Sequence, residues 1–389
     1  MKKRLFALIA LIALTSCGGS SSSSDPSSES SSSGVPNGLA PLVPYEGCEV
    51  PTLEGGWVAR WADEFGGTEL DDTKWNIEVN GEGGGNQELQ YYRSENIAVA
   101  DGSLAITAKK EAYLGKQYTS GRINTKYRME VRYGRVQARM KLPGGRGTWA
   151  AFWMMPLFNV YGTWPKSGEI DIMEYVGYNP NGVYGNRHTE IFNSNLGTAN
   201  AVRKTVDTAE EDFHLYEMIW SPGLITLYAD GAQFYQAGYV PQLNPTVKYN
   251  AAFPFDQEFF VILNLAIGGT WGGTQGVDDT IFPCTMLVDY VRVYGLDYAT
   301  IDQADPSTPT TLAKATLKNT FHWMKSTDDY GVEQYAVYVD GTFLKYVNLN
   351  QCTLTGLTPN QVYSVQVKAV DFVGRESALS DSLSFTYVS

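Results

Sequence analysis

Short runs in which apolar and polar residues alternate cover most of the chain after residue 56. The alternation is clearest in residues 135–142, 225–228 and 288–294, and a period of two residues is typical of strands with one buried face. Glycine, asparagine and aspartate separate these runs, and no long window has the period of an amphipathic helix. The pattern therefore predicts an all-β domain in which two antiparallel sheets pack as a jelly-roll sandwich with a concave, cleft-forming face.

One of these runs carries three carboxylates in an otherwise apolar strand. In residues 168–175, Glu169 and Asp171 fall on one face, whereas Glu174 falls on the other. One extra residue near Ile172 or Met173, a β-bulge, brings Glu174 onto the first face, and bulges are common beside active sites. We therefore predict a bulged strand with its three acids in a row.

Such a row suits glycoside hydrolysis with retention of configuration. In that reaction one carboxylate attacks the anomeric carbon, and a second, about 5 to 5.5 Å away, protonates the leaving oxygen. The outer pair, Glu169 and Glu174, are the candidates for these two roles. Asp171 lies between them, and its charge, or a proton shared with Glu169, would help to keep Glu174 protonated.

Tryptophans precede the acidic segment. The acidic spacing alone is weak evidence, because about 0.5 matches per chain are expected by chance at this acid content. Trp149, Trp153 and Trp164 strengthen it, because aromatic rings stack on the C–H faces of sugars. A single tryptophan is as often a core residue as a ligand contact. We expect Trp149 and Trp164 to be exposed stacking residues and Trp153 to line the floor of the cleft.

Four segments together resemble glycoside hydrolase family 16, namely residues 153–156, 164–165, 168–174 and 288–294. The resemblance covers most of residues 57–297, and the bulged Glu-x-Asp-x-x-Glu form is similar to the laminarinase branch of endo-β-1,3-glucanases. It implies a concanavalin-like jelly roll in which Glu169 is the nucleophile, Asp171 its hydrogen-bonding helper and Glu174 the acid/base. The residues alone do not order the two glutamates.

Three further residues are candidates for the cleft. Asn86 resembles part of a family segment that contacts sugars on the non-reducing side, where amides bind paired hydroxyls. His188 matches a family histidine near the cleavage point, and a hydrogen-bonded surface histidine is the alternative. Trp271 lies on a glycine-rich loop, where the backbone can approach a ligand closely. It could equally cover the core.

Metal chemistry finds little support in the sequence. The chain has three histidines, and no cysteine or histidine pair has zinc spacing, so we expect catalysis to need no cofactor. The family resemblance implies a structural calcium held partly by Asp289 and by residues near Glu64 and Gly102. Oxygen ligands from separate strands suit this ion.

The N-terminus predicts export and a lipid anchor. Three basic residues precede an apolar run that is too short to span a bilayer, and residues 14–17 resemble a bacterial lipobox. Residues 1–17 are therefore a predicted lipoprotein signal peptide, with Cys17 lipidated and holding the protein at the membrane of the cell envelope or its outer surface. Ordinary secretory cleavage, which leaves a soluble protein, is the alternative.

The rest of the chain divides into a linker and two modules. Residues 18–44 are a Ser-rich flexible tether with a reach of roughly 25 Å. Residues 45–298 form the expected catalytic domain, and residues 299–309 form a second linker. Residues 310–389 resemble a fibronectin type III domain, an immunoglobulin-like sandwich with Trp323 in its core. Such modules are mostly spacers, and sugar binding by it rests on analogy alone.

The net charge limits the kinds of binding partner, and the cysteine count limits the possible disulfides. The net charge of −13 argues against nucleic acid and favours a neutral polysaccharide over an acidic one. We expect a monomer. With Cys17 assigned to lipid, three cysteines remain, and a Cys48–Cys284 disulfide is a hypothesis that would stabilise by roughly 4 to 5 kcal/mol.

Three functions are compatible with these observations. The favoured one is a retaining endo-β-1,3-glucanase acting on laminarin-like glucans and also on mixed-linkage β-glucan. A galactan hydrolase of the agarase or carrageenase type is the neighbouring alternative. A non-catalytic surface glycan-binding lipoprotein is the third, although a binder has no need for three desolvated carboxylates.

Overall fold

The computed structural model describes residues 53, 56–238 and 251–388. The predicted signal peptide, Cys17, the Ser-rich tether and Cys48 lie outside these residues. Within the described ranges, no helix has the length and apolar character needed to cross a membrane.

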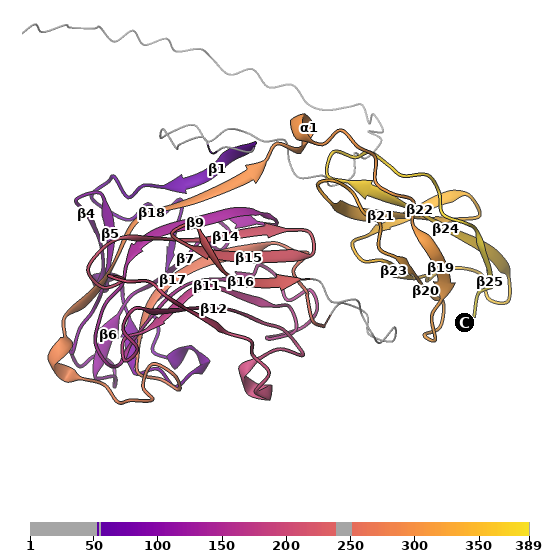
Figure 1. Ribbon diagram of the computed structural model, residues 1–389. Coiled ribbons are helices and arrows are strands. Elements are labelled where there is room, and N and C mark those ends of the chain that lie inside the picture. The colour runs from indigo at the N-terminus through magenta and orange to yellow at the C-terminus, as the bar shows by residue number, and fades with distance from the viewer. Residues whose placement is uncertain (1–52, 54–55, 239–250, 389) are drawn as a thin grey trace, which may run out of the picture. The chain divides into compact units, whose positions relative to one another are not determined.

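Two eight-stranded sheets form the larger part of the described chain (Figure 1). In the first sheet the order is β16-β15-β14-β9-β18-β5-β4, with β1 also paired to β18. All its strand pairs are antiparallel. Its strands are β1 (Trp57–Asp63), β4 (Ile97–Ala100), β5 (Ser103–Ala108), β9 (Gly134–Lys141), β14 (His214–Ser221), β15 (Leu224–Ala229), β16 (Ala232–Gly238) and β18 (Cys284–Leu296).

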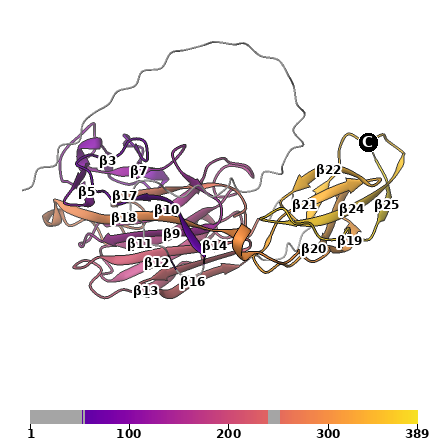
Figure 2. The same cartoon turned by 90° about the horizontal axis from the view of Figure 1, so that it is seen from above.

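The second sheet has the order β13-β12-β11-β10-β17-β7-β2, with β8 also paired to β17. Figure 2 shows β10, β11, β12 and β13 following one another across this sheet. Its strands are β2 (Asn76–Ile77), β7 (Arg122–Asn124), β8 (Glu130–Val131), β10 (Thr148–Pro156), β11 (Glu169–Val176), β12 (Gly182–His188), β13 (Val202–Thr205) and β17 (Phe259–Ile267).

Several short elements lie outside the two large sheets. A parallel pair, β3 (Gln90–Tyr92) and β6 (Tyr118–Ser120), lies outside them. Among the residues that the structure describes, the helical segments are four 3₁₀ turns and one short α-helix: η1 (Gly83–Gly85), η2 (Ser94–Asn96), η3 (Ser194–Leu196), η4 (Asp279–Ile281) and α1 (Tyr298–Ile301).

The core lies between the two large sheets. Along β9 every polar residue except Gln137 is only partly buried, while Val136, Ala138 and Met140 are fully buried. These side chains join Phe152 and Ile170 of the second sheet in one apolar cluster. Burying this surface is the main stabilising contribution to the fold. The predicted all-β jelly roll is confirmed.

Seven further strands of the described chain form two small sheets after residue 309. One has the order β19-β20-β23 and the other β22-β21-β24-β25. Trp323 and Phe321 are buried in their shared core. This second β module consists of β19 (Thr310–Lys314), β20 (Thr320–Met324), β21 (Val332–Val339), β22 (Thr342–Val347), β23 (Gln351–Thr353), β24 (Val362–Asp371) and β25 (Leu383–Thr386).

Candidate active site

The acidic strand β11 contains the predicted bulge. On one side Asp171 pairs with Trp153 of β10, while Glu174 pairs with Ala151, so the two residues 172 and 173 of β11 oppose the single residue Phe152. The register with β12 shifts over the same interval. The extra residue restores the phase of Glu174, and the predicted bulge is confirmed.

With the bulge, one face of the strand points into the core and the other face lines a pocket. Ile170, Ile172 and Met173 are completely buried in the core cluster. The three acids instead line a pocket over the second sheet. Apolar burial on one face therefore fixes the acids on the other, because the strand cannot slip without exposing its core residues.

Each glutamate accepts a hydrogen bond from a tryptophan. The indole N–H of Trp164 donates to Glu169 Oε2 at 2.5 Å, and that of Trp149 donates to Glu174 Oε1 at 3.0 Å. Trp149 and the acids reach each other because β10 and β11 are neighbours in the sheet. These bonds hold the two carboxyl groups in fixed orientations.

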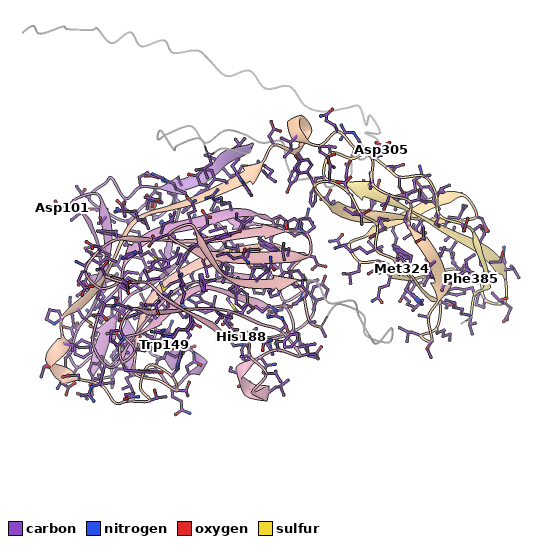
Figure 3. The ribbon with its side chains drawn as sticks, in the orientation of Figure 1. Asp101, Trp149, His188, Asp305, Met324 and Phe385 are labelled. Atoms are coloured by element: carbon purple, nitrogen blue, oxygen red, sulfur yellow. The ribbon has the colours of Figure 1, made fainter. Side chains whose placement is uncertain are left out.

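His188 lies at the other side of the acidic row. Its Nε2 is 3.5 Å from Asp171 Oδ2 and 3.9 Å from Glu169 Oε1. Asn186 Nδ2 lies 3.1 Å from the same nitrogen. The buried ring is 5.7 Å from that of Trp164. Figure 3 labels His188 and Trp149, which come from strands on either side of β11.

Burial and mutual repulsion raise the pKa of two of the acids. The pKa of Asp171 lies well above its usual range, first because the group is buried, then because Glu169 and Glu174 are charged and Glu169 shares a hydrogen bond with it. Burial and then the charge of Glu169 raise the pKa of Glu174 to about 8, against the opposing effect of the Trp149 bond. At neutral pH Glu174 is therefore mainly protonated.

The pocket brings most of the sequence-predicted residues together. Trp164 and His188 contact the acids from the side. Trp271 does not line the pocket but packs edge-on against Trp149 at 5.5 Å and against Tyr184 at 5.0 Å. The lining consists of Gly84, Asn86, Glu88, Arg122, Trp149, Ala151, Trp153, Glu169, Asp171, Glu174, Asn264 and Ala266.

Glu88 is a pocket residue that the sequence analysis missed. This buried carboxylate accepts hydrogen bonds from Gln90 Nε2 at 2.7 Å, Tyr92 Oη at 3.1 Å and Asn86 Nδ2 at 3.3 Å. Gln90 in turn accepts from the backbone N–H of Ile267, at the end of β17. The alternation of polar residues at 86, 88 and 90 was the available signal, since alternate residues share one side of an extended chain.

Asn264 and Arg122 are two further missed residues. Asn264 accepts the indole N–H of Trp153 at 2.7 Å and donates to the hydroxyl of Tyr92 at 3.2 Å. The guanidinium of Arg122 lies 4.9 Å from the Trp153 ring centre. A single amide inside the fully buried strand β17 was a readable signal, because a buried amide requires partners.

The residues expected to hold calcium are already paired. Arg292 donates to both carboxylate oxygens of Glu64 at 2.7 Å, and Arg139 lies 2.5 Å from Asp289. Calcium takes six to eight oxygen ligands, and carboxylates engaged by arginines do not fit that requirement. A calcium site at Glu64, Gly102 and Asp289 stays a prediction that none of these contacts supports.

Cys284 is a free, partly buried thiol, and burial raises its pKa to about 12. Its predicted disulfide partner lies outside the described residues. The free thiol lends the pairing no support.

The geometry offers acid and nucleophile chemistry in one pocket. Ligand atoms of Glu169, Asp171 and His188 lie within 4.8 Å of one another, a spacing that would also suit a metal. However, the raised pKa values of Asp171 and Glu174 favour proton-carrying groups over anionic ligands. The arrangement is that of a carboxylate beside a carboxylic acid, with aromatic walls.

Comparisons with known proteins agree with this site. Glycosyl hydrolases family 16 matches residues 64–292. A beta-glucanase of Rhodothermus marinus is 46% identical over 244 residues, which are 61% of this chain and 85% of that protein. The X-ray structure of the laminarinase from Rhodothermus marinus has a TM-score of 0.59 at 46% identity and covers 62% of this chain and 98% of its own. The crystal structure of SCLam, a non-specific endo-beta-1,3(4)-glucanase, has a TM-score of 0.58 at 37% identity. The match covers 67% of this chain and 98% of the SCLam chain. Because the matched family segment spans more than half of the sequence, the chain belongs to glycosyl hydrolase family 16.

Proposed function

We propose that this protein is a retaining endo-acting glycoside hydrolase that cleaves β-1,3-glucosidic bonds in laminarin-like glucans and also accepts mixed-linkage β-glucan. One observation carries the proposal: the bulged strand places Glu169, Asp171 and Glu174 on one face. The pKa of Glu174 at about 8 leaves it protonated at neutral pH beside a carboxylate. Retention requires such a pair.

In the first step, we propose that a carboxylate oxygen of Glu169 attacks the anomeric carbon while the bond to the leaving oxygen breaks. Glu174 gives its proton to that oxygen. In the second step, Glu174 takes a proton from water, whose oxygen attacks the same carbon and releases Glu169. Two inversions leave the product in the β configuration. Asp171 positions Glu169 and holds a proton between the two glutamates.

The relatives and the pocket walls support glucan as the substrate. The similar solved structures are a laminarinase and an endo-beta-1,3(4)-glucanase. In this chain Trp149, Trp153 and Trp164 surround the acids, and we propose that they contact pyranose rings. Asn86 and His188 would bind hydroxyl groups on either side of the cleavage point.

Product analysis tests the substrate assignment. The chain without residues 1–17 is incubated with laminarin, barley mixed-linkage glucan, agarose and carrageenan, and the products are separated by chromatography. Short β-1,3 oligosaccharides from laminarin are expected. Products from a galactan alone would overturn the glucan assignment, and no product from any substrate would favour a glycan-binding protein.

The variant Glu169→Gln tests the mechanism. Turnover of laminarin should fall by at least about 10³-fold, because the nucleophile is lost, while laminarin binding stays within a few-fold. Glu211→Gln, at an exposed carboxylate outside the pocket, is the matched control and should keep full activity. Unchanged turnover in Glu169→Gln would refute the assignment.

We also propose that residues 310–389 are a fibronectin type III spacer and that Cys17 anchors the protein, as a monomer, to a bacterial envelope membrane. Seven strands around Trp323 support the first part, and the lipobox-like sequence supports the second. Removal of residues 310–389 should leave turnover of soluble laminarin unchanged. Mass spectrometry of the N-terminus should find acyl chains on Cys17, and replacement by serine should release the protein from membranes.

A further inference from the structure

Four aspartates gather at the point where the chain enters the second β module. Asp302 directly follows α1. Asp328 and Asp329 lie in the loop between β20 and β21, and Asp371 is the last residue of β24. Oxygen atoms of Asp302, Asp328 and Asp329 lie within 4.8 Å of one another. Figure 3 labels Asp305, three residues further along the entering segment.

Two of these side chains are completely buried, which is unusual for aspartate. Asp302 and Asp371 both have an exposed fraction of 0%. One oxygen in each of Asp302, Asp328 and Asp371 accepts a structural hydrogen bond. Oδ1 of Asp371 accepts from the backbone of Val373 and Arg375, and Oδ1 of Asp302 accepts from Arg375 Nη1 at 3.1 Å. The backbone N–H groups of residues 330 and 331 donate to Asp328 Oδ2.

In each of these three aspartates the other carboxylate oxygen has no hydrogen-bond partner. Oδ2 of Asp302, Oδ1 of Asp328 and Oδ2 of Asp371 are buried and unpartnered. A buried polar atom without a partner is rare in folded proteins and calls for an explanation. Two of these aspartates, Asp302 and Asp328, belong to the group whose oxygens lie within 4.8 Å of one another, which indicates a shared ligand that accepts electron pairs from oxygen.

The charge of the cluster points to a cation. Arg375 is the ion-pair partner of Asp302 and Asp371, with its Nη1 at 3.1 Å and 3.8 Å. One arginine does not balance four carboxylates. Oxygen atoms of Asp302, Asp328 and Asp329 lie within 4.8 Å of one another, so their negative charges repel one another unless a cation lies between them.

We propose that Asp302, Asp328 and Asp329 form a calcium site, with Asp371 held beside it by Arg375. Carboxylate oxygens are hard ligands, which excludes a preference for zinc or copper. The donors come from a connecting segment and from the loop between β20 and β21, and calcium tolerates such irregular geometry better than magnesium does. Ion binding would remove the repulsion and join the entering segment to this loop of the module. Sites of this kind in extracellular modules bind with a Kd on the order of 10⁻⁴ to 10⁻³ M.

Titration of the full chain with CaCl₂ in a calorimeter, in metal-free buffer, tests the site. The chain should bind calcium, and Asp302→Asn should lose one bound ion or show at least about a tenfold weaker Kd, since a ligand charge is removed. Asp381→Asn, at an exposed aspartate of the same module outside the cluster, is the matched control and should bind like the natural chain.

Two further variants keep the test decisive. Asp328→Asn changes a partly exposed ligand and repeats the test if Asp302→Asn fails to fold. Asp289→Asn separates the site from the calcium predicted for the catalytic domain, and the loss caused by Asp302→Asn should persist in that background. Calcium binding that is absent from the natural chain, unchanged in both cluster variants, or lost only with Asp289→Asn would overturn the proposal.

Discussion

The hydrogen bond from Trp149 to Glu174 should lower the upper pH limit of catalysis. Its indole N–H, 3.0 Å from Oε1, stabilises the charged form of the carboxyl group and so lowers its pKa. The variant Trp149→Phe removes this donor but keeps an aromatic ring beside Trp271. The pKa of Glu174, about 8 in the natural chain, should therefore rise.

The size of the shift follows from the strength of the bond. A hydrogen bond to a charged group contributes about 1.5 to 3 kcal/mol, and one pKa unit corresponds to about 1.4 kcal/mol. Removing the bond should raise the pKa of Glu174 by about 1 to 2 units. Since the first step needs the protonated acid, the alkaline limb of kcat/KM should move to higher pH by the same amount.

The assay is laminarin hydrolysis between pH 5 and 10, with circular dichroism at each pH to show that the protein stays folded. Trp271→Phe is the control, because this residue packs on Trp149 and does not line the pocket; its alkaline limb should not move. An alkaline limb that stays in place or moves to lower pH in Trp149→Phe would refute the assignment of Glu174 as the acid.

Three other predictions concern residues around the acids. Gly168 has φ = +89° and its added Cβ would lie 2.8 Å from Phe255, so Gly168→Ala should lower the unfolding free energy by about 1 to 3 kcal/mol; an unchanged denaturant midpoint would contradict this. Glu88→Gln replaces one acceptor oxygen by an NH₂ group, so either Asn86 or the pair Gln90 and Tyr92 loses its acceptor; stability should fall by about 1 to 3 kcal/mol and KM for laminarin should rise, as steady-state kinetics would show. The raised pKa of Glu174 means that the folded state binds its proton more tightly, so stability falls as pH rises from about 4.5 through about 8. Glu174→Gln should therefore melt at a higher temperature than the natural chain at pH 9, with a smaller difference at pH 5.

The sequence predicted the position of the bulge because only one local change satisfies two constraints at once. Ile170 and Ile172 require a core face, and three carboxylates require the opposite one. A regular strand violates one of these requirements at Glu174. The bulge follows from residue chemistry within eight positions, without knowledge of any neighbouring strand.

Contacts between distant segments could not be predicted in the same way. Glu88 becomes buried because its segment joins the end of β17, through the bond between Gln90 and Ile267. The pairing spans about 180 residues, and nothing local indicates it. Tryptophans show the same limit, since Trp220 is a core residue while Trp149 bonds to an acid of the pocket. Local sequence does not separate these environments.

The causes of the raised pKa values of Asp171 and Glu174 explain why the strand carries three carboxyl groups. Burial is the largest cause of the raised pKa of Asp171 and of Glu174. The charge of Glu169 is the second cause of both shifts, and Trp164 donates a hydrogen bond to the Glu169 carboxylate. Repulsion from Glu169 therefore adds to burial in keeping the proton on Glu174. The bulge makes this possible, because it puts Glu174 on the face where the charge of Glu169 acts on it.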